Sequence, residues 1–153
     1  MTQWLILRVL IVLFAVAGLA DALYFTLAYY GRIRKARWVP EILCAREGSS
    51  CVTVVRTPYA RVLGVPNSLL GIIYYLLLIA WIGFVPRYLN LSGRVFRPFE
   101  TLGLWLLGAS VCTVVLGFYL IYALRRVLYT HCRLCYAAHA INLALFVLLI
   151  LVS

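Results

Sequence analysis

The chain has few charged residues, and acidic ones are almost absent. Only 12% of its 153 residues are Asp, Glu, Lys or Arg, and just 4 of these are acidic. A typical soluble domain has about a quarter of its residues charged and about half apolar. Here 66% of the residues are hydrophobic and the mean hydropathy is +1.04. A soluble fold could not bury this much apolar surface, so a soluble enzyme is excluded and the solvent must be lipid.

Internal repeats and low-complexity segments are also missing, and the apolar runs do not alternate as the strands of a membrane barrel do. Four runs are long enough for helices, since crossing a bilayer core takes about 20 residues. Lipid cannot satisfy exposed backbone groups, which favours helices. We therefore predict an all-α fold, an integral membrane bundle of four transmembrane helices forming one domain over residues 1–153. The helices are expected at about 5–30, 65–86, 101–124 and 132–152, with a cap loop at 31–64 between the first and second. The first run lacks a signal-peptide cleavage site and is interpreted as a retained helix.

The net charge of +10 is assigned to membrane topology rather than to nucleic-acid binding, because the basic residues flank the apolar runs. With four spans, both termini lie on one face. That face carries four basic residues, whereas the first loop and the third connection together carry ten. The positive-inside rule then places the first loop in the cytoplasm, in a multi-pass protein of the cell membrane. Functional arginines in that loop would mislead the rule, and disulfide chemistry in the cytosol is unusual, so the extracytoplasmic alternative stays open.

A C-x-x-C pair, Cys132 and Cys135, stands at the start of the last apolar run. Residues three apart on a helix are neighbours and lie within the span of a disulfide. The N-terminus of a helix, with Thr130 expected as its cap, stabilises a thiolate, and Arg133 adds positive charge. The pattern predicts a redox-active pair. The alternative is two inert buried cysteines.

Polar residues continue along the face of the helix that the C-x-x-C begins. Cys132, Cys135, His139, Asn142 and Phe146 follow one another at steps of three and four residues, which is helical spacing. Polar groups inside a bilayer are costly and are functional candidates by default. We therefore expect His139 and Asn142 to line a pocket beneath the cysteines. The alternative for both is hydrogen bonding between helices.

Two further groups lie deep in predicted spans. Asp21 is expected to hydrogen-bond a neighbouring helix or the cap loop, and we interpret it as structural rather than catalytic. Cys112 has no partner nearby in the sequence and is interpreted as a small packing residue.

The predicted cap loop carries a second pair of cysteines, Cys44 and Cys51. A loop of this length is too long to be structureless in a compact protein, and we expect a short amphipathic helix around 52–63. The two cysteines can pair with each other, or either can exchange with Cys132 if the loop folds over the mouth of the last helix. A purely structural staple is the alternative.

These features together resemble the vitamin K epoxide reductase (VKOR) family in its prokaryotic form, over nearly the whole chain. The resemblance is carried by several short matches rather than by one motif. They are Gly18-Leu19-Ala20-Asp21-Ala22-Leu23-Tyr24, Cys44 with Cys51, Thr57, Gly64-Val65-Pro66-Asn67-Ser68-Leu69-Leu70-Gly71, and Cys132 with Cys135.

The resemblance implies a quinone-coupled thiol–disulfide oxidoreductase that supports disulfide formation in other proteins. Cys132 and Cys135 would be the active-site pair, and Cys44 and Cys51 the pair that passes electrons to it from a thioredoxin-like partner. The quinone would be a menaquinone, ubiquinone or vitamin K type, contacted by Asn67. Thr57 matches a hydroxyl residue of the family. This chain has His139 where animal members have Tyr, and His139 could still donate a hydrogen bond to a quinone oxygen, so Thr57 and His139 join Asn67 as the expected quinone-binding residues. Many bacterial members carry a fused thioredoxin-like domain, and here we expect a separate partner protein instead.

Two other classes of function were weighed against this interpretation. Neutral imidazoles and thiolates bind zinc or copper, so His131, Cys132, Cys135 and His139 could make a metal-binding membrane protein. A structural or transport protein with its cysteines as staples is the second. Our prediction remains an oxidoreductase without a resident metal.

Overall fold

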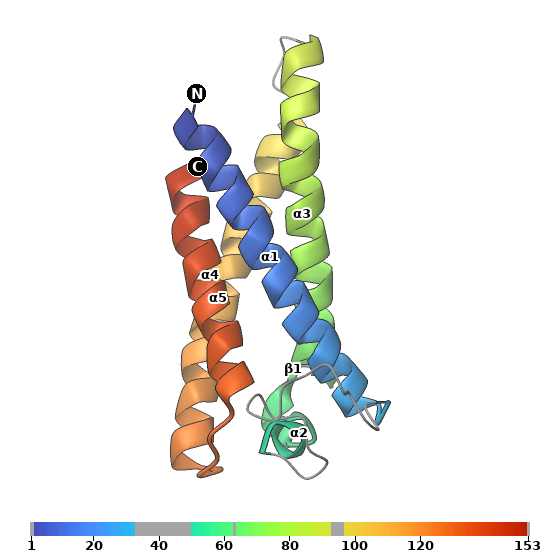
Figure 1. Ribbon diagram of the computed structural model, residues 1–153, viewed down its shortest axis with the longest axis vertical. Coiled ribbons are helices and arrows are strands. Elements are labelled where there is room, and N and C mark those ends of the chain that lie inside the picture. The colour runs from blue at the N-terminus through green and yellow to red at the C-terminus, as the bar shows by residue number, and fades with distance from the viewer. Residues whose placement is uncertain (1, 33–49, 63, 93–96, 153) are drawn as a thin grey trace.

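The computed structural model describes residues 2–32, 50–62, 64–92 and 97–152. In these parts the chain is helical apart from one small hairpin, in agreement with the predicted all-α class. The elements in chain order are α1 (Thr2–Tyr29), α2 (Ser50–Val55), the 3-10 helix η2 (Pro58–Ala60), β1 (Arg61–Val62), β2 (Val65–Pro66), α3 (Asn67–Ser92), α4 (Arg97–Arg126) and α5 (Arg133–Val152). The four long helices form an elongated bundle (Figure 1). The start of α1 and the end of α5 lie at one end of it, and α2 lies at the other.

Three of the long helices have the length and composition needed to cross a membrane. They are the apolar stretches Gln3–Tyr29, Thr101–Arg126 and Arg133–Val152. The apolar stretch of α3 within the described residues, Asn67–Gly83, is shorter. A membrane protein is therefore supported, and the fourth span remains a prediction.

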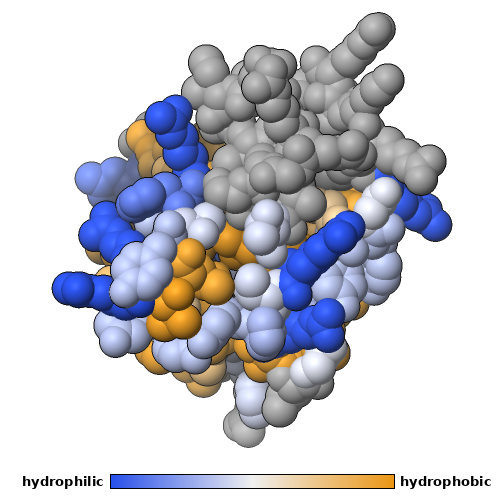
Figure 2. Space-filling view, turned by 90° about the horizontal axis from the view of Figure 1, so that it is seen from below, coloured by the Kyte–Doolittle hydropathy of each residue, from blue (hydrophilic) through white to orange (hydrophobic). Residues whose placement is uncertain are grey.

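The outer surface of the bundle is apolar, as expected when lipid is the solvent. Large side chains face outward along the length of α4, and Trp105 and Phe118 are 78% and 64% exposed. Polar groups gather instead at the end that carries α2, where hydrophilic side chains surround an apolar centre (Figure 2). The exposed arginines of that end are Arg32, Arg56, Arg61, Arg125, Arg126 and Arg133.

Small residues let the helices approach closely, which is the usual way that helices pack in lipid. Gly71 on α3 faces Ala22 on α1, where an added Cβ atom would lie 3.5 Å from the Ala22 side chain. Along the same contact, Gly18 leaves room for the ring of Tyr75. A core of buried side chains from α1, α3, α4 and α5 runs through the middle of the bundle, and Ile11, Leu78 and Leu145 are fully buried in it.

The segment between α1 and α3 differs from the sequence prediction. A single amphipathic helix was expected around 52–63, but α2 ends at Val55 and is followed by η2 and the antiparallel pair β1–β2. Pro58 explains the break, because a proline disfavours helical geometry in the residue before it, and Thr57 is extended with ψ 156°. The part of the predicted cap loop at 33–49 lies outside the described residues.

Candidate active site

The C-x-x-C lies where α5 begins. Helix α5 starts at Arg133, so Cys132 occupies the capping position before it. The backbone N–H of Cys135 donates a hydrogen bond to the Cys132 sulfur, at 3.3 Å. The expectation that Thr130 caps this helix is wrong. Its hydroxyl donates to the carbonyl of Leu128 at 2.8 Å instead, because the helix starts two residues later than a Thr130 cap requires.

This geometry favours the thiolate of Cys132. The hydrogen bond from the Cys135 side chain is the largest influence that lowers the pKa of the Cys132 thiol, and backbone N–H groups of Cys135 and Leu134 lower it further. Burial and the negative charge of Asp21 act in the opposite direction. Free N–H groups at a helix N-terminus stabilise anions in general. The predicted activation of this cysteine therefore has a structural cause.

Both cysteines of the pair are shielded from solvent. Cys132 is 0% exposed and Cys135 is 8% exposed, and both carry thiols in this structure. They pack in a cluster with Phe25 of α1, Val55 of α2 and Leu124 of α4. Helix α2 therefore lies against the start of α5. Cys51 is the second residue of α2, whereas Cys44 lies outside the described residues.

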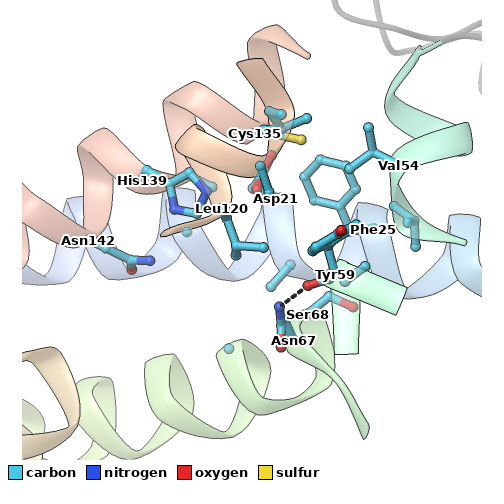
Figure 3. Close-up of a pocket in the computed structure, with 18 of the residues that line it drawn as sticks. Asp21, Phe25, Val54, Tyr59, Asn67, Ser68, Leu120, Cys135, His139 and Asn142 are labelled. Atoms are coloured by element: carbon cyan, nitrogen blue, oxygen red, sulfur yellow. Dashed lines mark hydrogen bonds between the residues drawn. The ribbon is translucent and has the colours of Figure 1, made fainter. Parts of the chain in front are cut away.

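A pocket of about 160 Å³ opens beneath the C-x-x-C, and Cys135 rather than Cys132 lines it (Figure 3). Its wall is mainly apolar, with polar groups from three helices. The lining residues are Gly18, Asp21, Ala22, Phe25, Val54, Val55, Tyr59, Ala60, Asn67, Ser68, Gly71, Tyr75, Leu120, Ala123, Leu124, Leu128, Cys135, Ala138, His139 and Asn142. An apolar cavity with a few convergent polar groups is typical of a binding site for a small organic molecule.

Three of these polar side chains have a buried atom that forms no hydrogen bond with any part of the chain that the structure describes. They are Oδ1 of Asp21, Oδ1 of Asn67 and Nδ1 of His139. Buried polar groups in native proteins are nearly always hydrogen-bonded, and each exception calls for an explanation. Because all three line the same pocket, a bound ligand with polar atoms is the simplest explanation.

The positions of Asn67 and His139 are set by their neighbours. Asn67 is the first residue of α3, and its side-chain amide donates to the carbonyl of Tyr59 at 3.3 Å. His139 packs against Gly117 of α4, where an added Cβ atom would lie 2.9 Å from the His139 Nδ1. The two residues enter the pocket from α3 and α5 (Figure 3).

Asn142 serves mainly to join two helices. Its Oδ1 accepts a hydrogen bond of 2.6 Å from the hydroxyl of Tyr75 on α3. Gly18 of α1 makes this contact possible, because an added Cβ atom there would lie 2.4 Å from the Tyr75 ring. Asn142 still lines the pocket, so both of the roles considered for it apply. Phe146, the next residue on the predicted stripe, is not part of the lining.

Two other residues singled out in the sequence lie elsewhere than predicted. Thr57 lies in the turn after α2 and outside the lining of the pocket, and its hydroxyl donates to the carbonyl of Val54 at 2.7 Å. Cys112, expected to be a packing residue, is exposed on α4. In the described parts of the chain, no three His, Cys, Asp or Glu side chains are placed to hold a metal ion.

Sequence reasoning missed two features of the pocket. Asp21 was interpreted as structural, but it lines the cavity together with Cys135. The aromatic wall from Phe25 and Tyr59 was not anticipated at all. The signal for Asp21 was present, since an acidic residue inside a span is a functional candidate. Nothing in the sequence indicated that Tyr59 would fold back beside α3.

Comparison with known protein families shows what this chain is similar to. The family model described as the vitamin K epoxide reductase family matches residues 9–150 of the 153 in the chain. The comparison with curated proteins gave no match.

Proposed function

Because the chain belongs to the vitamin K epoxide reductase family, which implies a membrane thiol–disulfide oxidoreductase, we propose that it oxidises thiols at the expense of a membrane quinone. One observation carries the proposal. Cys135 lines an apolar pocket in which Asp21, Asn67 and His139 each present a polar atom without a hydrogen-bond partner. A thiol and unpaired polar groups around one mainly apolar cavity suit a small ligand that is apolar at its centre and polar at its edges.

The lining fits a quinone ring. A quinone presents two carbonyl oxygens, which need hydrogen-bond donors, on an otherwise apolar ring. Asn67 has a second amide N–H beyond the one given to Tyr59, and the imidazole of His139 has an N–H in either tautomer. Phe25 and Leu124 would flank the ring. A bound quinone would supply a two-electron, two-proton acceptor, which matches the two electrons and two protons that a dithiol loses on forming a disulfide.

Preorganised donors at these positions would stabilise negative charge on the quinone oxygens. The acceptor is a menaquinone, ubiquinone or vitamin K type. Cys135 is the cysteine that faces it, and Cys132 is the cysteine that exchanges with the rest of the relay. This division of roles rests on the lining of the pocket, which includes Cys135 alone of the pair.

Electrons would enter through the loop pair. A reduced thioredoxin-like protein attacks the Cys44–Cys51 disulfide, and the loop thiols then reduce the Cys132–Cys135 disulfide, each step by exchange through a mixed disulfide. The packing of α2 against the start of α5 supports Cys51 as the residue that reaches Cys132. The site would face the cytoplasm, with the whole chain crossing the cell membrane four times and the loop covering the bundle.

Quinone reduction by the purified protein tests this proposal. A small dithiol serves as donor and a short-chain naphthoquinone or ubiquinone as acceptor. We expect hydroquinone formation by the wild type and by Cys112→Ser, which lies outside the pocket. We expect a loss of at least about 100-fold in Cys135→Ser, since a covalent participant is removed. Full activity in Cys135→Ser would refute the assignment of Cys135. Folded wild-type protein that reduces neither class of quinone would refute the function.

A further inference from the structure

Asp21 is an acidic residue in the middle of a membrane-spanning helix, and it lines the same pocket as Cys135. It is the only aspartate in the chain, and the three glutamates, Glu41, Glu47 and Glu100, lie outside the apolar runs. Its carboxyl group points into the pocket from α1, on the side where Cys135 lies (Figure 3). Its Oδ1 is buried and has no hydrogen-bond partner among the described residues.

Among the residues that the structure describes, no basic side chain lines the pocket beside this carboxyl group. The described lining contains no lysine or arginine, and His139 is the one residue in it with a titratable nitrogen. Burying an unpaired charge is far more costly than burying a neutral group. A neutral carboxylic acid, in contrast, carries one O–H donor. The surroundings of Asp21 therefore suit an acid that holds a proton.

The titratable groups around Asp21 include both members of the C-x-x-C. Helix α5 contributes Cys135 and His139, helix α3 contributes Tyr75, and α1 itself contributes Tyr24. Cys132 lies just before α5, close enough to Asp21 that an ionised carboxylate there would raise the pKa of its thiol. From α2, Val54 and Val55 line the pocket and cannot titrate. Within the described ranges, Asp21 is thus the carboxyl group that lies beside both the thiols and the cavity.

We propose that Asp21 relays a proton between the Cys135 thiol and the molecule bound in the pocket. This inference rests on the proposed quinone-coupled function and adds a residue to it. A relay is needed because Cys135, unlike Cys132, lines the pocket, so its proton leaves the sulfur beside the bound molecule rather than into bulk water. A carboxyl group beside both partners provides the route.

The relay balances within the overall reaction. As the Cys132–Cys135 bond forms, the two thiols lose two electrons and two protons. Asp21 gives its proton to the bound acceptor, so one O–H bond breaks at Asp21. The carboxylate then takes the proton of Cys135, so the S–H bond breaks and the O–H bond of Asp21 is restored. The remaining two protons balance through the aqueous side. The proton of Cys132 is released to it, and one proton enters the pocket from it to complete the reduction of the acceptor.

Three variants of the full chain test the relay. Asp21→Asn keeps the size and a hydrogen-bond donor but cannot carry a proton, Asp21→Glu keeps the acid, and Cys112→Ser is the control outside the pocket. Single-turnover oxidation of the reduced protein by a short-chain naphthoquinone gives the rate. Binding of the same quinone, followed by quenching of tryptophan fluorescence in protein whose cysteines are already oxidised, gives the affinity without turnover. Infrared spectra of reduced, quinone-free protein report the carboxylic acid C=O band.

General acid–base groups contribute about 100-fold or more to rate. We therefore expect Asp21→Asn to slow the single turnover by about 100-fold, with quinone affinity changed by less than about threefold. Asp21→Glu should recover most of the rate. In the wild type the rate should rise with pH as the Cys132 thiolate forms and fall again as Asp21 loses its proton. Asp21→Asn should lose the falling limb and the carboxylic acid band.

The possible outcomes separate the relay from the proposed function. Wild-type protein that reduces no quinone contradicts the function itself. An active wild type with an equally fast Asp21→Asn variant refutes the relay alone. So does a loss of quinone affinity in Asp21→Asn that Asp21→Glu fails to restore, because Asp21 would then be a structural group. If Asp21→Asn does not fold, two other measurements test the relay. It is refuted if Asp21→Glu fails to recover most of the wild-type rate, or if the wild-type rate does not fall at high pH.

Discussion

At the scale of single residues, the two cysteines of the C-x-x-C have different surroundings although they are three residues apart. Cys132 caps α5 and accepts a hydrogen bond from the N–H of Cys135, whereas Cys135 lines the pocket. One sulfur is therefore placed to exist as a thiolate and the other to meet a ligand. This difference depends on the residue at which the helix begins.

The pKa of Cys132 gives a prediction at this scale. Because hydrogen bonding from the Cys135 side chain lowers this pKa, the Cys132 thiolate should form at a lower pH than an ordinary cysteine thiolate, for which the pKa is about 8.5. Cys135→Ala removes the donor and should move the titration to higher pH, while Cys135→Ser retains an O–H donor and should move it less. The ultraviolet absorbance of the thiolate, taken as a difference from the matching Cys132→Ser protein, measures each titration. Identical curves for wild type and Cys135→Ala would contradict the assigned cause.

The sequence was sufficient to predict which residues of α5 share a face, but it could not predict their individual roles. Helical spacing brings Cys135, His139 and Asn142 to one side, and all three line the pocket. That Asn142 would be hydrogen-bonded to Tyr75 depends on Gly18 of a third helix. The cap of α5 depends on a difference of two residues in where the helix starts, which local patterns do not resolve.

At the scale of elements, glycines determine where side chains enter the pocket. Gly117 on α4 leaves the space that the His139 ring fills, and Gly108 on the same helix faces nothing within 4 Å. Helices α1 and α5 begin and end within a few residues of the predicted ranges, whereas α3 continues to Ser92 and α4 begins at Arg97. Helix α3 begins at Asn67 rather than 65 because Val65 and Pro66 pair with β1. The hairpin itself was not predicted, since strands of two residues carry no periodic signal.

The glycine pair on α4 offers a matched test. Gly117→Ala would place a methyl group 2.9 Å from the His139 Nδ1 and displace the ring. We expect a loss of about 1–3 kcal/mol in the free energy of unfolding, as for other overpacked sites, and about tenfold slower quinone reduction. Gly108→Ala should change stability by less than about 0.5 kcal/mol, as is usual for open positions. Denaturant unfolding in detergent measures the stability of each variant, and the quinone assay measures its activity. Wild-type activity in Gly117→Ala would show that the function of His139 does not require the space beside Gly117.

At the scale of the whole molecule, the two ends of the bundle differ in character. The start of α1 lies at one end, and the C-x-x-C and the exposed arginines lie at the other (Figures 1 and 2). The charge count in the sequence indicated this asymmetry before the fold was known. Which end faces the cytoplasm depends on the membrane, so it is a prediction of the positive-inside rule.

Labelling of introduced cysteines tests this orientation. In a background with the native cysteines replaced by serine, Trp4→Cys and Arg126→Cys place one thiol at each end of the bundle, both at exposed positions. We expect an impermeant maleimide added to intact cells to label Trp4→Cys and to reach Arg126→Cys only after the membrane is opened. The reverse pattern would place the C-x-x-C outside the cytoplasm. Labelling of both from the same side would contradict the four-span topology.

The burial of the two thiols has a consequence for selectivity. Cells contain abundant small thiols, and glutathione is the main one in many. An open C-x-x-C would be reduced by them directly, and the oxidising power of the membrane would be consumed without any protein gaining a disulfide. Here Phe25, Val55 and Leu124 enclose the pair, so a donor must first displace apolar side chains. Direct access to the pair is thereby limited to a segment of protein that can bind there, so a small thiol would reduce the buried pair only by way of that segment.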